Sequence, residues 1–145
     1  MIHVAIIAPD YLNAILAGRK VVESRLTLTR REPFGRITPG DRLYFKASGG
    51  AFGATATAAR VDSHEEMTPA NVRALRRTLG RFILGTDAFW RAKLTARYAT
   101  LIWLERVEPI AIGPDYRAHP SWASGRAWYT LPETWCVYKA ARRAA

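Results

Sequence analysis

The apolar residues of this chain come in short runs broken by proline and glycine, so only short strands and helices can form. Residues 2–8 form an apolar run of the length of a buried strand, which Pro9 stops. The clearest later strand covers residues 99–107, and Pro109 ends it. The uncharged opening stretch, residues 1–9, is too short to cross a membrane and lacks the form of a secretion signal. We therefore expect a soluble, cytoplasmic protein.

The remaining periodic segments predict a mixture of strands and short helices. Strands are expected at 21–26, 42–48 and 51–62, with a further short one at 110–112, and helices at 11–16, from 69 to Gly80, and at 87–94. Asp10 is expected to cap the first helix. A chain of 145 residues forms about one domain. The fold class is therefore α+β: a small mixed or antiparallel β-barrel, partly open, with five to six strands and about three short helices.

The charge of the chain is strongly positive. It has 22 basic and 12 acidic residues, which give a net charge of +10. Such a charge favours polyanions, and nucleic acid is the usual one. The alternative is a coding bias, because most of the cations are arginine and alanine is abundant, as a GC-rich gene would produce. The single cysteine, Cys136, and three histidines far apart in sequence predict no metal site, and no cofactor motif is present.

One segment carries a recognisable motif. Residues Gly18 to Arg25 have the pattern G-x-K-x-x-E-x-R, between a short helix and a strand. A Pro-Gly-Asp turn at residues 39–41 leads into another strand. Together they resemble the signature of the ASCH domain, a family of the PUA-like superfamily, over about residues 2–110. The resemblance implies a PUA-like β-barrel whose cleft is lined by the lysine, glutamate and arginine of the motif.

The resemblance also implies a ligand related to RNA or to nucleobases. Members of this family are proposed RNA binders, and some bacterial ones have been linked to ribonuclease activity or to amide hydrolysis of acylated cytidine. The branch that resembles amidohydrolases carries threonine where this chain has Glu23. The site residues that the motif implies are therefore Lys20, Glu23 and Arg25.

The chemistry of these three side chains fits a nucleic-acid ligand. Glu23 and Arg25 share one face of a strand. An arginine fork can hold a phosphate, and a glutamate can accept a hydrogen bond from the exocyclic amine of a base. Lys20 can hold a phosphate or, when desolvated, act as a base. The alternatives are an ion pair that only pins the strand and an ordinary solvated lysine.

A second candidate set lies on the next strand, where Tyr44, Lys46 and Ser48 share one face. A phenol, a cation and a hydroxyl could in principle cleave RNA without a metal. The alternative is a half-exposed strand face. Arg30 and Arg31, in the basic loop that follows the motif, are further candidates for phosphate contacts.

Aromatic residues are concentrated near the end of the chain. We expect one ASCH-like domain over residues 1–145, with about 111–145 as an aromatic-rich C-terminal extension and the last ten residues as a basic tail. Trp122 and Trp128, near Arg126, can stack on bases, although core packing is the alternative.

Three functions follow from these observations. The first is binding of RNA or single-stranded nucleic acid in a basic cleft, and the second is a metal-independent ribonuclease or a hydrolase of a modified nucleoside. The third is an adaptor for a small molecule or a protein, with the positive charge as a product of coding bias. The expected partners are RNA or single-stranded nucleic acid, or a nucleotide-like small molecule. No cofactor, metal or membrane partner is expected, and the oligomeric state stays open.

Overall fold

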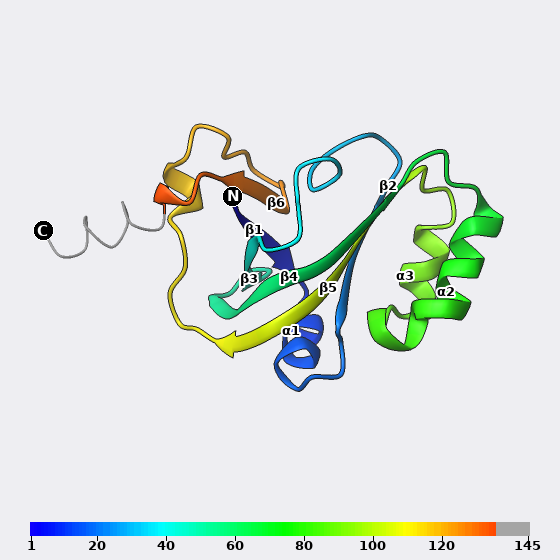
Figure 1. Cartoon of the computed structure of the whole chain (residues 1–145), viewed down its shortest axis with the longest axis horizontal. Coiled ribbons are helices and arrows are strands. Elements are labelled where there is room, and N and C mark those ends of the chain that lie inside the picture. Colours follow the sequence, from blue (N-terminus) through cyan, green and yellow to red (C-terminus); the bar gives the residue numbers. More distant parts are fainter. Residues whose placement is uncertain (136–145) are drawn as a thin grey trace, which may run out of the picture.

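The computed structural model describes residues 1–135 as one mixed sheet with three α-helices (Figure 1). The elements in chain order are β1 (Ile2–Ile7), α1 (Pro9–Leu16), β2 (Val22–Thr27), β3 (Arg42–Ala47), β4 (Phe52–His64), α2 (Pro69–Ile83), α3 (Asp87–Ala92), β5 (Tyr98–Pro109), the 3₁₀ turn η1 (Tyr116–Ala118) and β6 (Trp128–Leu131). Within this part of the chain, no helix is long and apolar enough to span a bilayer.

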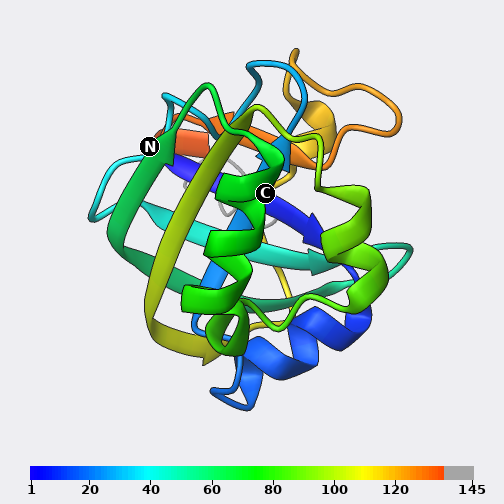
Figure 2. The same cartoon turned by 90° about the vertical axis from the view of Figure 1, so that its right-hand side faces the viewer.

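The six strands form one sheet in the order β2-β5-β4-β3-β1-β6. Only the β1–β3 pair is parallel, and the other pairs are antiparallel. The long strands β4 and β5 bend, with register shifts between Thr55 and Thr57 and between Ala58 and Arg60. Irregular pairing of this kind increases local twist and bending. The sheet therefore curls into a half-barrel, with β2 and β6 as its two edges (Figures 1 and 2). The predicted fold class is confirmed.

The two faces of the curled sheet pack against different helices. On the inner face, Leu12 and Ile15 of α1 join a buried cluster with Phe45 of β3. On the outer face, α2 and α3 cover β2 and β5, where Leu26 packs in the same cluster as Trp90 (Figure 2). Because side chains alternate along a strand, the residues of β2 between its apolar ones point into the curl.

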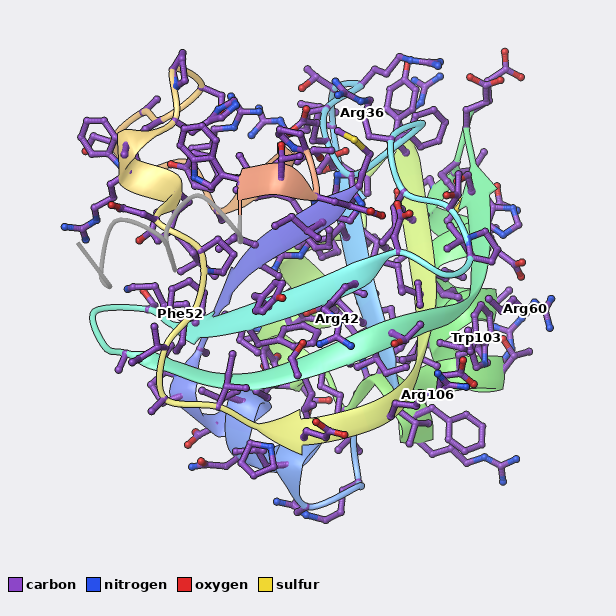
Figure 3. All side chains as sticks on the ribbon, turned by 60° about the vertical axis from the view of Figure 1, so that its left-hand side comes forward. Arg36, Arg42, Phe52, Arg60, Trp103 and Arg106 are labelled. Carbon is purple, nitrogen blue, oxygen red and sulfur yellow. The ribbon has the colours of Figure 1, made fainter. Side chains whose placement is uncertain are left out.

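The outer surface beyond the helices carries paired charges and stacked cations. Arg60 of β4 lies opposite Trp103 of β5 in the register, and its guanidinium lies 4.5 Å from the centre of the indole ring (Figure 3). Arg60 also forms two hydrogen bonds to the carboxylate of Asp62, at 3.1 and 2.8 Å. The guanidinium of Arg60 therefore already has partners within the sheet.

The ends of two helices differ from the sequence prediction. The first helix begins at Pro9 with Ala8 as N-cap, so Asp10 does not cap it and lies in its first turn. A carboxylate there still interacts favourably with the helix dipole. The second helix continues through Gly80 and ends at Ile83, because its C-cap Leu84 has a left-handed conformation with a φ of 62°. Glycine costs about 1 kcal/mol inside a helix, which the packing of this face outweighs.

The C-terminal part of the described chain also differs from expectation. Residues 110–112 form no strand, whereas Trp128–Leu131 form β6, antiparallel to β1. This strand was not predicted from the sequence, because aromatic residues are equally typical of a buried core or of a lid over the barrel. The predicted basic tail and Cys136 lie outside the described residues.

Candidate functional site

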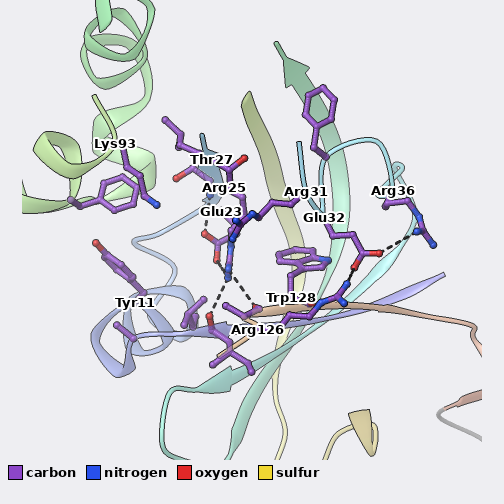
Figure 4. A pocket seen from close by; sticks show the side chains of 18 of the residues that line it. Tyr11, Glu23, Arg25, Thr27, Arg31, Glu32, Arg36, Lys93, Arg126 and Trp128 are labelled. Carbon is purple, nitrogen blue, oxygen red and sulfur yellow. Dashed lines mark hydrogen bonds and ion pairs between the residues drawn. The ribbon is translucent and has the colours of Figure 1, made fainter. Parts of the chain in front are cut away.

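A cavity of about 870 Å³ lies at the open seam of the half-barrel (Figure 4). Its walls come from the inner face of β2, the end of β1, the loop that follows β2, α3 and the segment that enters β6. Arg25 reaches across this seam from β2. Its guanidinium donates to the carbonyl oxygen of Ile6 at 3.2 Å and to that of Ala127 at 3.5 Å. The cavity therefore lies in the gap between β2 and the β1–β6 end of the sheet, which do not pair as strands. We call it the seam cavity.

The walls of the seam cavity carry an excess of positive charge. The cations that line it are Arg25, Arg30, Arg31, Arg36, Lys93 and Arg126, and the carboxylates are Glu23 and Glu32. Arg36 and Arg126 both pair with Glu32, at 3.1 and 2.7 Å. That carboxylate is therefore already shared between two guanidinium groups (Figure 4).

Of the remaining cations, Arg30 pairs with Glu65 at 3.6 Å, whereas Arg25, Arg31 and Lys93 lie near one another in the seam cavity. Burial, and then the positive charges of Arg25 and Arg31, lower the pKa of Lys93. Glu23 Oε2 lies 3.8 Å from the Arg25 guanidinium, which is close enough for an ion pair but too long for a hydrogen bond. Like charges held together raise the free energy of the empty site, and an anion bound among them would relieve that repulsion.

Aromatic rings form the apolar part of the wall, from Tyr11, Phe34, Phe89 and Trp128. The Arg25 guanidinium lies 5.0 Å from the centre of the Trp128 ring. The indole N–H of Trp128 donates to Nδ1 of His3 at 3.2 Å, which fixes the orientation of the ring. On its other side, the His3 ring hydrogen-bonds through Nε2 to Asp41 at 2.8 Å. Burial lowers the pKa of His3, although Asp41 opposes the shift.

Glu23 presents an unused acceptor at this site. Its Oε1 accepts from the backbone N–H of Ser24 at 2.9 Å, while Oε2 is buried and has no hydrogen-bond partner within the described residues. A buried acceptor without a partner costs about 1–3 kcal/mol. Since Glu23 lines the seam cavity, a ligand that donates a hydrogen bond to Oε2 would remove this cost.

Lys20 is placed differently from the other two motif residues. Its side chain is buried and does not line the seam cavity. The ammonium donates to the carbonyl oxygen of Ile83 at 2.6 Å and to that of Val22 at 3.1 Å, and it lies 4.0 Å from Glu23 Oε1. Burial lowers its pKa, and Glu23 opposes the shift. Lys20 thus ties the end of α2 to β2 immediately behind Glu23.

The predicted site residues fall into three groups. The seam cavity brings together Glu23, Arg25, Arg30, Arg31, Arg126 and Trp128. A second cavity of about 500 Å³ is lined by Lys46, Ser48, Trp122 and, again, Arg126. Tyr44 lines neither; it packs beside the buried cluster that contains Tyr129. Lys93, Tyr11 and Phe89 were not predicted, because helical spacing indicates only that a residue lies on a helix, not which strand edge it faces.

The fold is similar to that of solved ASCH structures from Zymomonas mobilis. The crystal structure of ASCH from this organism has a TM-score of 0.71 and 17% identity, over 97% of this chain and 94% of that one. A serine-to-alanine mutant of that protein has a TM-score of 0.72 and 20% identity, over 97% and 95%. No protein-family model and no curated protein matches the sequence significantly. The structural similarity confirms, for the fold, the resemblance that the Gly18–Arg25 segment predicted.

Proposed function

We propose that the protein binds RNA or single-stranded nucleic acid in the seam cavity. The observation that carries this proposal is that Lys93, Arg25 and Arg31 line the same cavity as Glu23, whose buried Oε2 accepts no hydrogen bond within the described residues. The cations suit the phosphate groups, and Glu23 suits the exocyclic amine of a base, as in recognition of cytosine N4. The similarity to ASCH structures supports the proposal at the level of the fold.

The aromatic wall supports a nucleic acid over a simple anion. A base can stack on the half-buried ring of Phe34, and such a contact contributes about 1–3 kcal/mol, whereas Trp128 is buried and already contacts Arg25 and His3. A cavity of about 870 Å³ is within the size range of small-ligand sites and accepts a nucleotide with its flanking phosphates. A sulfate or a carboxylate would use the cations but leave both the rings and Glu23 without a role.

The test is fluorescence anisotropy of a labelled single-stranded RNA at two salt concentrations. We expect affinity to fall steeply with salt, because each phosphate contact releases condensed counterions. Arg31→Gln should weaken binding, whereas Arg19→Gln, which removes the same charge from an exposed position outside the cavity, should have little effect. Equal affinities for the two variants, or binding that does not respond to salt, would contradict the proposal.

Cleavage of the bound strand is a second candidate. The second cavity, which holds Lys46 and Ser48, shares Arg126 and five other lining residues with the seam cavity, so one strand can lie along both. The same RNA is therefore run on a gel after incubation, with chelator present. Products that disappear in Lys46→Ala would support a ribonuclease, and intact RNA would support binding alone. If RNA does not bind, a nucleotide-like small ligand is the next class to screen.

A further inference from the structure

Helix α2 carries an unusual charge for a surface helix. Its 15 residues include four arginines, at positions 73, 76, 77 and 81, and no acidic residue. All four arginines are exposed, while the opposite stripe of the helix, with Val72 and Leu75, packs on the sheet. Ordinary surface helices mix both signs of charge, which supports the helix through i, i+4 pairs. The absence of acids from this helix leaves its outer side uniformly positive.

A groove of about 510 Å³ runs between this face of α2 and helix α3. Arg73 and Arg76 of α2 and Arg91 of α3 lie along it, and Trp90 contributes to its apolar lining. Asp87 is the one acidic residue that lines the groove, and it pairs with Arg76. Arg73 and Arg91 therefore supply the net positive charge of the groove.

The groove and the seam cavity lie on two sides of the same short helix. Phe89 and Lys93 at α3 line the seam cavity, whereas Trp90 and Arg91 line the groove. A helix with its side chains is about 10–12 Å across, which a few nucleotides of an extended strand can span. A strand that leaves the seam cavity past Lys93 thus meets Arg91 and Arg73 next.

We propose that the groove between α2 and α3 is a second contact surface for the sugar–phosphate backbone of the strand held in the seam cavity. This inference rests on the proposed function. It extends the ligand from a single nucleotide to a strand long enough to cross α3. The contacts are to phosphate, so they add affinity and no base preference.

The experiment compares two lengths of labelled single-stranded RNA, a trinucleotide and a 15-mer. The proteins are the wild type, Arg73→Gln/Arg91→Gln, and a matched control, Arg19→Gln/Arg42→Gln. The control removes two exposed arginines that line none of the three cavities described above; Arg42 lies on β3 (Figure 3). Both double variants lower the net charge by two, so a general loss of electrostatic attraction affects them equally.

We expect the trinucleotide to bind the two double variants alike and the 15-mer to bind the wild type more tightly than the trinucleotide. Arg73→Gln/Arg91→Gln should lose most of that gain. Its salt dependence, as the slope of log K against log salt, should fall by about 1.4, because each single-strand phosphate contact contributes about 0.7. Equal losses in the two double variants would overturn the proposal.

Two further outcomes separate this proposal from the function on which it rests. If the 15-mer binds through Arg73 and Arg91 but the trinucleotide does not bind at all, the groove is supported and the seam cavity is not. A polyglutamate peptide that binds the wild type and not Arg73→Gln/Arg91→Gln, with RNA binding unchanged, would assign the groove to an acidic protein partner and overturn the proposal.

Discussion

Replacing Lys20 by methionine distinguishes a structural anchor from a ligand-binding group. Methionine keeps an unbranched apolar stem of similar length and removes the ammonium. The change deletes the hydrogen bonds to the carbonyl oxygens of Ile83 and Val22 and leaves Glu23 without the cation 4.0 Å away. Because the Lys20 side chain does not line the seam cavity, we expect the loss to appear in stability first.

The magnitude follows from these contacts. Hydrogen bonds from a charged donor contribute about 1.5–3 kcal/mol each. Removing one partner of a buried ion pair costs about 3–5 kcal/mol, because the other charge stays buried. The two estimates describe the same atoms and are not added. We therefore expect Lys20→Met to lower the free energy of unfolding by about 3–5 kcal/mol, which is roughly 10–15 °C in Tm for a chain of this size.

Urea unfolding followed by tryptophan fluorescence measures this loss, with Lys46→Met as the control because Lys46 is only partly buried. The double variant Lys20→Met/Glu23→Gln should be less destabilised than Lys20→Met, since it also removes the orphaned charge. A Lys20→Met protein within about 1 kcal/mol of the wild type that nevertheless loses RNA binding would refute the reasoning and place the ammonium in the ligand site.

Three more expectations concern Lys93 and Glu23 in the wall of the seam cavity and the buried His3, which contacts Trp128. Lys93→Gln should weaken RNA binding while leaving urea stability unchanged or higher, because it relieves repulsion; a large loss of stability would contradict this. Glu23→Gln should reduce the preference for bases with an exocyclic amine by about tenfold, because a specific contact to a base contributes about 1–3 kcal/mol of discrimination. Competition between RNA homopolymers measures this preference. Urea stability should decrease as pH falls below about 6.5, because burial lowers the pKa of His3 and the unfolded chain takes up the proton first. His3→Gln should remove that dependence between pH 7.5 and 5.5.

The local part of the site could be predicted from the sequence. Strand alternation places Glu23 and Arg25 on one face, and the structure has both in the wall of the seam cavity. The same alternation predicts a shared face for Tyr44, Lys46 and Ser48, of which Lys46 and Ser48 line the second cavity, whereas Tyr44 packs beside a buried cluster. Spacing within one strand is enough for such predictions, because neighbouring side chains are placed by the backbone alone.

The rest of the site depends on contacts between distant segments. Lys93 and Trp128 reach the seam cavity only because β5 pairs with β2 and β6 pairs with β1. Neither pairing leaves a pattern in the sequence, since strands of similar composition can pair in several orders. The role of Lys20 was hidden for the same reason: its partner Ile83 lies 63 residues away, at the end of a helix.

The strand order also explains why two of the motif residues, Glu23 and Arg25, line the seam cavity. A strand within a sheet has neighbours on both sides, whereas β2 is an edge strand whose free side faces the seam. An unpaired edge exposes backbone groups that invite association with another chain, and charged side chains are a common protection. Arg25 serves this purpose when it donates across the seam to Ile6. The same placement puts Glu23 and Arg25 in the wall of the seam cavity, because β5, and not β1, is the neighbour of β2.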